Sequence, residues 1–398
     1  MIRRGYFFLA AHFFPILQFL GAQFSPKIKQ RVSALKVQKV NTQGVIWFHC
    51  SSLGEYEMAM PLIQEFLDNS QDHILVSFFS ASGYGKCEET GRISKIYLPL
   101  DSQANAAELF KNINPKAFIL VKYEFWLAYM EEAIKQGIPS FLVSGLLRPG
   151  HFMGKFYGKP WRRSLAGFEG LYMQNQESVE IAKKMGLKAT FSGDLRFNRV
   201  LENKAVNPAN PIFEHFAGQH KNVLILGSSW LAEEKMLSKL TLPEGLGVII
   251  APHDISAKHI KEIKTLFPAA QSYTDYKEVK SKILILNTIG QLKYAYQYGH
   301  FAFIGGAFGK GLHNILEPMA YGLPVIFGPQ HHKFPEGKLA QEQGIGFQVN
   351  SVIELQKTID LLYLNYKNYE SNIKKWVSSM QVNTSSIFAQ IKASIKKA

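Results

Sequence analysis

Cysteine is scarce in this sequence. The 398 residues contain only Cys50 and Cys87, which is too few for a disulfide framework or a Cys-rich metal cluster. The histidines are scattered and lack the spacing of metal ligands, so we expect no metal site and no cofactor. So few cysteines are typical of a protein in a reducing compartment.

Acidic residues are also few compared with basic ones. The chain has 31 Asp and Glu against 45 Lys and Arg, a net charge of +14. Such an excess favours anionic partners, which include nucleic acids, acidic lipids and phosphorylated substrates. No helix-turn-helix, zinc finger or aromatic RNA-binding motif occurs, so we expect no nucleic-acid partner. The hydrophobic content of 46% is typical of globular proteins, and the length predicts two domains.

The first 40 residues form a hydrophobic and basic segment. Arg3 and Arg4 precede about twenty mostly apolar residues, enough for one membrane span. His12 and Pro15 interrupt the run, so a helix lying in the membrane interface, or docked on the protein itself, is an alternative. The basic residues that follow favour a cytoplasmic location for the rest of the chain. We expect residues 1–40 to be a membrane anchor.

From residue 44 onward, apolar strands alternate with amphipathic helices. In the first half the expected strands are 44–50, 73–79, 94–101, 116–126, 139–145 and 170–175. A linker is expected at 199–221, and the pattern then restarts with expected strands at 222–229, 246–253, 281–288, 300–307 and 324–329. Such alternation predicts parallel sheets covered on both faces. We therefore expect two doubly wound α/β domains, 41–205 and 206–398, with ligands bound beyond the carboxyl ends of the strands in a shared cleft.

The stretch "FHCSSLGEYEMAMPLI" (48–63) places an acid at the start of a helix. A buried strand ends near Cys50, a Ser-Ser-Leu-Gly turn follows, and Glu55 lies at the first turn of the helix. The carboxylate either complements the helix dipole or serves as a base toward a ligand above the sheet. This stretch alone leaves both readings open.

The segment "FIGGAFGKGLHNILEP" (303–318) has the composition of a phosphate-binding loop. Gly305 and Gly306 end a strand and allow backbone N–H groups to approach an anion closely. We expect the next helix to start near His313–Asn314, with Glu317 in its first turn, where a carboxylate accepts hydrogen bonds from ribose hydroxyls. The alternative is a glycine-rich turn with Asn314 as a cap and Glu317 as a dipole complement.

Three further strand ends in the second half are candidates for the same ligand. Ser228 and Ser229 follow a buried strand and precede a helix, which suits either an anion site or ordinary N-capping. His253 leaves another strand end, although an isolated histidine is more often structural. The turn at Gly290 closes a third strand before a helix and could receive a base or a phosphate.

In the first half, two segments suit an anionic amphiphile. Lys122 and Glu124 lie at a strand end, where they are functional or simply face solvent. "GLLRPGHFMGKFYGKPWRRSL" (145–165) mixes basic and aromatic residues, among them Arg148, Arg162 and Arg163. Basic groups suit phosphates and the aromatic groups suit acyl chains. The alternative is a solvated basic loop.

In this order, the segments "SSLGE", "YLPLD", "EFW", "SGDLRF", "GSS", "IGGAFGKGLHNILEP" and "GLPVIFGPQHHKF" resemble those of the 3-deoxy-D-manno-octulosonic acid (Kdo) transferases. The resemblance covers nearly the whole chain. It implies a GT-B fold with an N-terminal membrane anchor and inverting transfer of Kdo from CMP-Kdo to the lipid A precursor (lipid IVA). The chain departs from many members at Lys122, where they have an acid, and at Pro252-His253-Asp254, where they carry Pro-Arg-His.

The resemblance implies that Glu55 is the catalytic base and that Asn314 and Glu317, with His313 adjacent, meet the cytidine nucleotide. Together with the strand-end residues of the second half named above, these make up the expected donor-binding set. It consists of Ser228, Ser229, His253, Gly290, Gly305, Gly306, His313, Asn314 and Glu317. The expected acceptor-binding residues are Ser52, Gly54, Lys122, Glu124, Arg148, Arg162 and Arg163. The expected location is the cytoplasmic face of the inner membrane. The alternatives are a GT-B glycosyltransferase that uses a UDP-sugar and a non-catalytic GT-B-like protein that binds membranes.

Overall fold

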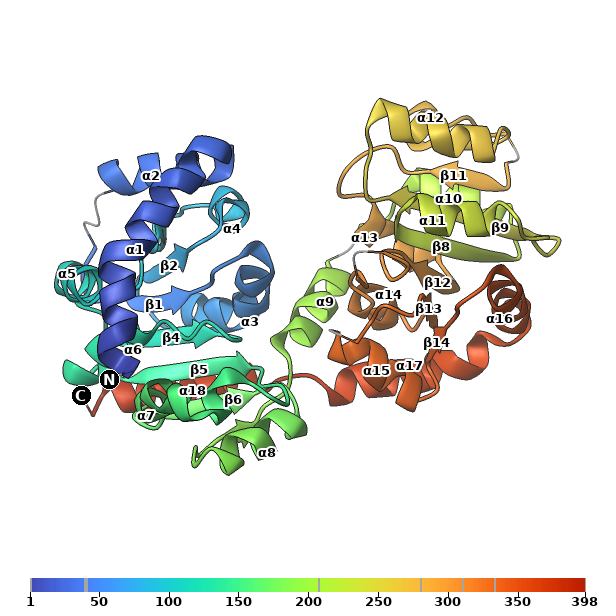
Figure 1. Cartoon of the computed structure of the whole chain (residues 1–398). Coiled ribbons are helices and arrows are strands. Elements are labelled where there is room, and N and C mark those ends of the chain that lie inside the picture. Colours follow the sequence, from blue (N-terminus) through green and yellow to red (C-terminus); the bar gives the residue numbers. More distant parts are fainter. Residues whose placement is uncertain are drawn as a thin grey trace. The chain divides into compact units, whose positions relative to one another are not determined.

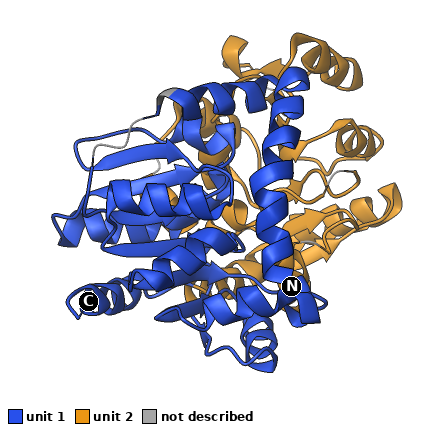
Figure 2. Cartoon of the chain, turned by 60° about the vertical axis from the view of Figure 1, so that its left-hand side comes forward, with its two compact units in different colours: residues 1–199, 381–398 blue, residues 200–380 orange. Residues whose placement is uncertain are grey.

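The computed structural model describes residues 2–38, 42–206, 208–279, 281–309, 311–332 and 334–397. The chain forms two compact units, coloured separately in Figure 2. Unit 1 comprises Met1–Arg199 and Gln381–Ala398, and unit 2 comprises Val200–Met380. Within the described ranges, each unit contains one sheet of seven strands, and every pair of neighbouring strands is parallel. Figure 1 shows helices packed against both sheets.

Unit 1 is doubly wound. Its strands are β1 (Ile46–His49), β2 (Ile74–Phe78), β3 (Ile93–Tyr97), β4 (Ala117–Val121), β5 (Ser140–Gly145), β6 (Gly170–Met173) and β7 (Thr190–Phe191). They are arranged in the order β3-β2-β1-β4-β5-β6-β7. The strand succession therefore reverses between β1 and β4, and such a switch point is where open α/β sheets bind ligands.

Both faces of the unit 1 sheet are buried, as the strand composition predicts. Along β1, Trp47 packs into one core cluster while Ile46 and Phe48 pack into another, because successive side chains point to opposite faces. The helices of this unit are α1 (Ile2–Phe24), α2 (Pro26–Val37), α3 (Leu53–Asn69), α4 (Ala81–Lys86), α5 (Gln103–Ile113), α6 (Leu127–Lys135), α7 (Lys159–Leu165), α8 (Gln176–Lys184) and α18 (Thr384–Ile395). Helix α9 (Leu195–Ala205) crosses the boundary between the units.

Unit 2 is also doubly wound. Its strands are β8 (Asn222–Ser229), β9 (Leu246–Pro252), β10 (Gln271–Ser272), β11 (Ile283–Ile285), β12 (Phe301–Ile304), β13 (Val325–Phe327) and β14 (Gly346–Gln348), in the order β10-β11-β9-β8-β12-β13-β14. Its helices are α10 (Pro211–Gly218), α11 (Leu231–Leu237), α12 (Ala257–Leu266), α13 (Leu292–Ala295), α14 (Leu316–Ala320), α15 (Pro335–Glu342), α16 (Val352–Asn365) and α17 (Lys367–Ser379). The switch point lies between β8 and β12.

The predicted α/β class with two doubly wound domains is confirmed. Most expected strands are shortened at their ends, and β4 is the clearest case. It ends at Val121 rather than continuing to residue 126, because Lys122 adopts a left-handed backbone conformation with φ of 70°. The linker expected at 199–221 contains the end of α9 and, as expected near its own end, a helix, α10.

The end of the chain differs from the expected domain division. Helix α18 packs on α3 in unit 1, whereas the sequence placed everything after residue 205 in the second domain. Ile387 and Ile391 are buried in the unit 1 core. Lys392 reaches Asp72 at 2.6 Å. An amphipathic helix requires an apolar partner, but its sequence does not say which one.

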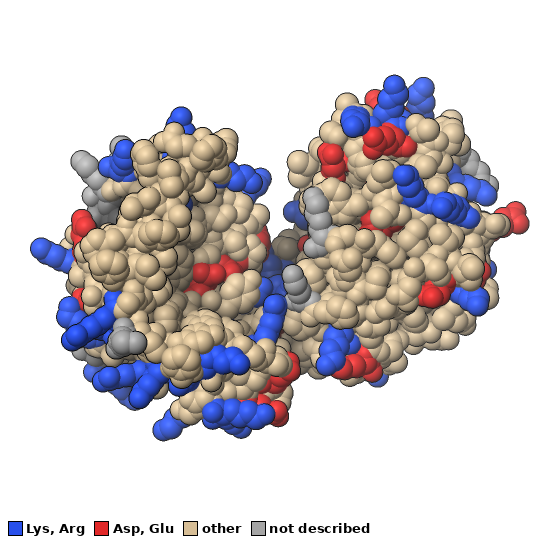
Figure 3. Space-filling model, viewed as in Figure 1, with Lys and Arg blue, Asp and Glu red and all other residues tan. Residues whose placement is uncertain are grey.

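Helices α1 and α2 lie along unit 1 (Figure 2). Arg3 forms a bidentate ion pair with Glu131, with N–O distances of 2.7 to 3.0 Å. The Tyr6 hydroxyl donates to Asp101 at 2.5 Å. Helix α1 is nevertheless long and apolar enough to cross a membrane, and only 11% of its most apolar window is buried. In Figure 3 the surface over α1 carries few charges, and Lys and Arg side chains lie near both of its ends.

Candidate active site

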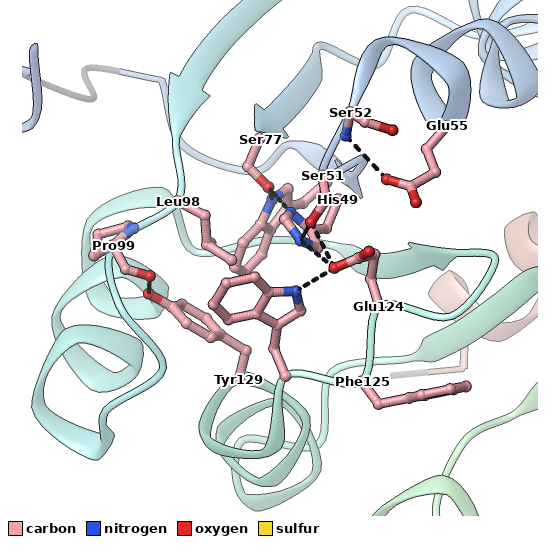
Figure 4. A network of polar contacts seen from close by, with 12 residues as sticks. His49, Ser51, Ser52, Glu55, Ser77, Leu98, Pro99, Glu124, Phe125 and Tyr129 are labelled. Carbon is pink, nitrogen blue, oxygen red and sulfur yellow. Dashed lines mark hydrogen bonds and ion pairs between the residues drawn. The ribbon is translucent and has the colours of Figure 1, made fainter. Parts of the chain in front are cut away.

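The switch point of the unit 1 sheet gathers Ser52, Glu55, Lys122 and Glu124, which the sequence singled out, together with Ser51, which it did not. Ser51, Ser52 and Glu55 follow β1, and Lys122 and Glu124 follow β4. Because β1 and β4 are adjacent parallel strands, their carboxyl ends bring these two segments together. Figure 4 shows the carboxylates of Glu55 and Glu124 pointing toward one another at this edge.

Glu124 is held at the end of a directed chain of hydrogen bonds. Trp47 Nε1 donates to Ser77 Oγ at 2.8 Å, and Ser77 Oγ lies 2.8 Å from His49 Nδ1. His49 Nε2 lies 3.3 Å from Ser51 Oγ, which donates to Glu124 Oε2 at 2.5 Å. An indole N–H only donates and a carboxylate only accepts. Because Ser51 donates its hydroxyl proton to Glu124, its Oγ accepts from His49, so His49 Nε2 carries a proton.

This chain keeps Glu124 ionised. Burial acts to raise the pKa of Glu124, but hydrogen bonds and the charge of His49, together with Ser51 and Trp126, outweigh it and the pKa is lowered. Trp126 Nε1 donates to the same carboxylate oxygen at 2.8 Å. Two donors on one carboxylate oxygen, with His49 nearby, favour the charged form of Glu124.

Glu55, in contrast to Glu124, favours the protonated form. The side chain lies at the first turn of α3, and its carboxylate accepts the backbone N–H of Ser52 at 2.9 Å. Burial, with the negative charge of Glu124, raises the pKa of Glu55 to about 8. The Ser52 N–H and the charge of Lys122 lower this pKa but do not offset the burial. Two neighbouring carboxyls with divergent pKa values are typical of acid–base sites.

The backbone around the site is strained. Lys122 and Ser144, at the ends of β4 and β5, have φ values of 70° and 50°, and Ser228 in unit 2 has a φ of 52° at the end of β8. Non-glycine residues rarely adopt this region, and they cluster at functional sites. By contrast, Gly54 has an ordinary φ, and a Cβ there would meet no atom within 4 Å. The space above the start of α3 is therefore open.

The structure places Arg148 and Arg162 on one hollow and Arg163 on another. Arg162 donates to the carbonyls of Met153 and Lys155 and so supports the local loop. Arg148 and Arg163 are exposed and line different hollows, of about 650 and 1060 Å³. Arg163 shares its hollow with Arg3 and other basic side chains of α6 and α7.

In unit 2 the ends of β8 and β12 approach each other closely. A Cβ on Gly305 would lie 2.4 Å from the Ser228 carbonyl oxygen, so only glycine fits there. Gly306 has a φ of 91° and donates its N–H to Glu233 at 2.8 Å. The Ser229 hydroxyl is fully buried and donates to Glu234 at 2.7 Å. Of the two serines, only Ser228 is therefore free to offer its hydroxyl to a ligand.

Three aromatic rings lie over this edge of the sheet. His253, which follows β9, stacks on both Trp230 and His313, with ring centres 4.6 and 4.7 Å from its own. Trp230 Nε1 donates to His313 Nε2 at 3.1 Å. Nε2 must therefore be unprotonated, and the proton of the neutral ring lies on Nδ1. Burial and the nearby His253 lower the pKa of His313, which agrees with this neutral form.

The segment after the glycine loop is less regular than expected. Helix α14 begins at Leu316, not near His313–Asn314, and is only 5 residues long. Asn314 accepts the Leu316 N–H at 2.9 Å and donates to Glu317 at 3.1 Å. Glu317 does lie in the first turn, as predicted. Gly290 lies in a turn before α13 with a φ of 88°.

The sequence did not single out His49, Ser51, Ser77, Trp126 or Trp230. His49 and Ser77 carried a signal, because polar residues inside short buried strands need partners. Trp126 and Trp230 carried none, since tryptophan is ordinarily read as core. Among the described residues, no group of three or more His, Cys, Asp or Glu side chains could hold a metal ion.

Residues 26–199 match the family described as 3-deoxy-D-manno-octulosonic-acid transferase (kdotransferase). The chain is 28% identical to the 3-deoxy-D-manno-octulosonic acid transferase of Aquifex aeolicus, over 79% of this chain and 85% of that one. It is 25% identical to the transferase of the same name from Haemophilus influenzae, over 88% of each chain.

Solved structures show the same fold. The UDP-GlcNAc 2-epimerase of Neisseria meningitidis, bound to UDP-GlcNAc, aligns with a TM-score of 0.61 at 13% identity, over 88% of this chain and 100% of that one. The UDP-GlcNAc 2-epimerase of Methanocaldococcus jannaschii aligns with a TM-score of 0.55 at 13% identity, over 81% and 93%. At these identities the likeness concerns the fold alone. The expected GT-B architecture is confirmed.

Proposed function

Because the chain belongs to the Kdo transferase family, we propose that it transfers Kdo from CMP-Kdo to the lipid A precursor of lipopolysaccharide. The observation that carries the proposal is the pair of buried carboxyls at the switch point of unit 1. Glu124 is kept ionised by its hydrogen bonds, and the pKa of Glu55 is raised toward neutrality. A carboxyl with such a pKa is suited to accept a proton near physiological pH.

In this mechanism Glu55 is the general base. A hydroxyl of the acceptor attacks the anomeric carbon of Kdo in one inverting displacement, and Glu55 accepts the hydroxyl proton as the new glycosidic bond forms. The bond from Kdo to the phosphate breaks, and CMP leaves with its electron pair. Lys122 lowers the pKa of Glu55, so its charge favours the ionised base.

Unit 2 is the proposed donor-binding unit. The Ser228 hydroxyl offers a donor to the phosphate of CMP-Kdo. It lies beside Gly305 and Gly306, whose own N–H groups donate to Gly227 and Glu233. Glu317 and Asn314 suit the ribose hydroxyls, while His253 and His313 offer ring faces near the same edge. The turn at Gly290 is the remaining expected contact with the nucleotide.

We further propose that the protein acts at the cytoplasmic face of the inner membrane. Nine large hydrophobic side chains of α1 and α2 are exposed: Phe8, Leu9, Phe13, Ile16, Leu17, Phe19, Leu20, Phe24 and Ile28. The first turns of α1 are tied to unit 1 by Arg3 and Tyr6. A helix bound along its own domain, with an apolar outer face and basic residues nearby, is typical of interfacial membrane binding.

The test is incubation of the purified protein with CMP-Kdo and the tetraacylated, bisphosphorylated lipid A precursor, followed by mass spectrometry. We expect acceptor masses that increase by one or more Kdo units. Glu55→Gln should lose most turnover while still binding CMP. Glu57→Gln, on the same helix but with an exposed side chain paired to Arg199, should stay active.

Two results would contradict the proposal. Turnover of a UDP-sugar but not of CMP-Kdo would indicate another GT-B glycosyltransferase. If Glu55→Gln supported lipopolysaccharide synthesis in cells as well as wild type, the protein would have a binding role and Glu55 would be only a helix cap.

A further inference from the structure

A cavity of about 520 Å³ lies between the α1–α2 pair and the body of unit 1. Helix α1 contributes Phe14 and Leu17 to its lining, α2 contributes Ile28 and Arg31, and the body contributes Phe79 and Trp126. The volume is in the range of small-molecule sites. Most of this lining is apolar.

Among the polar residues of this lining, which include Lys27 and Asp101, Arg31 is a buried cation. Its side chain is only 5% exposed, and its guanidinium lies 3.9 Å above the Phe79 ring. One nitrogen donates to the Leu98 carbonyl at 2.6 Å, while Nε has no hydrogen-bond partner. In the described part of the chain no carboxylate lies within ion-pair distance of Arg31. Asp101, in the same cavity, is bound by Tyr6 and the Ala128 amide instead.

A buried cation without a counter-ion is costly, and a nearby anion removes that cost. Arginine also binds phosphate in a bidentate manner. The cavity therefore fits a ligand with two parts, an apolar chain and an anionic group that meets Arg31.

The cavity adjoins the candidate active site. Trp126 lines the cavity and donates to Glu124. Phe79 packs 5.0 Å from the Trp126 ring. The backbone N–H groups of Phe79 and Ser80 both donate to the Ser51 carbonyl, at 3.2 and 2.7 Å. One wall thus separates the cavity from the carboxylate network.

We propose that this cavity binds an acyl chain of the lipid acceptor, with a phosphate of the same lipid on Arg31. The proposal rests on the proposed function and names the part of unit 1 that recognises the acceptor. It also assigns a role to the α1–α2 pair besides membrane attachment, because the pair forms one wall of the acceptor site.

The test compares two neighbouring residues of α1. Leu17 lines the cavity and Ile16 does not, yet their side chains are similarly exposed, at 50% and 54%. Leu17→Trp should raise the KM for the tetraacylated acceptor by about tenfold or more, since the larger ring occupies the space of the chain. It should leave the KM for a fully deacylated acceptor unchanged. Ile16→Trp should change neither value.

Further variants address the other walls. Ala81→Leu narrows the cavity from the body side and should reproduce the effect of Leu17→Trp. Arg31→Gln should raise the KM for the phosphorylated acceptor, and Arg31→Lys should restore part of the affinity. Thermal unfolding confirms that each variant is folded. Equal KM values for Leu17→Trp, Ala81→Leu, Ile16→Trp and wild type would overturn the proposal.

Crosslinking distinguishes the acceptor from bulk lipid. An acceptor analogue with a diazirine at an acyl end should label peptides that contain Leu17 or Ile28, and unlabelled acceptor should compete. The proposal would also be overturned if a diazirine phosphatidylglycerol in vesicles labelled the same peptides and unlabelled acceptor did not compete with it. Absence of Kdo transfer by the wild-type protein would instead refute the proposed function, a separate outcome.

Discussion

The carboxyls of Glu55 and Glu124 face each other at the carboxyl edge of one sheet, and their pKa values shift in opposite directions (Figure 4). Glu124 receives hydrogen bonds from Ser51 and Trp126, so it keeps its charge. Glu55 accepts one backbone N–H and is 4% exposed, so it tends to stay protonated. The charge of Glu124 therefore adds to burial in keeping Glu55 protonated.

Glu124→Gln should move the pH dependence of the reaction to lower pH. In the wild-type protein, kcat/KM should rise with pH to an apparent pKa of about 8, as Glu55 loses its proton. The glutamine amide of the variant carries no charge, so it no longer opposes ionisation of Glu55. We expect the rising limb to shift down by about one pH unit or more, measured as kcat/KM from pH 5 to 10. If the rising limb of the kcat/KM profile did not move, the group that titrates would not be Glu55.

Lys122→Gln should have the opposite effect. The Lys122 charge lowers the pKa of Glu55, so its removal should shift the limb to higher pH and reduce the rate at pH 7. Because Lys122 has a left-handed φ, Lys122→Asn is the second variant, since asparagine tolerates this conformation better. An unmoved limb with a raised KM in both variants would show that Lys122 acts by contact with substrate rather than through Glu55.

Glu55→Gln should increase stability at alkaline pH while it removes activity. The folded pKa of Glu55, about 8, lies above the unfolded value of about 4.3. The stability linked to the protonated form is thus complete below about pH 4 and is lost as pH rises through about 8. Glutamine does not titrate, so the variant should gain about 1–3 kcal/mol relative to wild type between pH 6 and pH 9.

Urea unfolding at the two pH values measures this difference. Glu57→Gln, an exposed position on the same helix, is the control for the substitution itself. If the unfolding free energies of Glu55→Gln and Glu57→Gln changed equally with pH, burial would not be the cause of the raised Glu55 pKa.

Gly305→Ala should damage unit 2, and Gly309→Ala should not. A Cβ on Gly305 would lie 2.4 Å from the Ser228 carbonyl oxygen, whereas one on Gly309 would meet no atom within 4 Å. We expect Gly305→Ala to cost about 1–3 kcal/mol and to weaken CMP binding, because β8 and β12 must separate. Thermal unfolding and calorimetric titration with CMP measure both effects. Similar behaviour of the two variants would contradict this account of the glycine loop.

Trp230→Phe should raise the pKa of His313. The indole N–H donates to His313 Nε2 and so stabilises the neutral ring. Phenylalanine retains the stacking on His253 but lacks the donor. Proton–nitrogen NMR of the histidine side chains should show a higher His313 pKa and loss of the fixed tautomer. An unchanged titration would leave burial as the cause of the low pKa.

Local patterns were enough to predict the two doubly wound units, because buried strands and amphipathic helices have distinct periods. They were also enough to place Glu55, Lys122 and Glu124 at strand ends. They were not enough for α18, whose apolar face fits either unit. The serine hydroxyls were not distinguishable either: Ser228 and Ser229 are neighbours in the chain, yet the Ser229 hydroxyl is bound by Glu234.

The order of residues along the chain therefore established the fold class, the resemblance to the Kdo transferases and a carboxylate at the start of α3. It could not show whether that carboxylate was a cap or a base, since Glu55 is both bound to Ser52 and buried beside Glu124. Only the sheet topology brings β1 and β4 together, although they lie far apart in the chain. Protonation depends on burial and on nearby charges, and these exist only after the strands have paired.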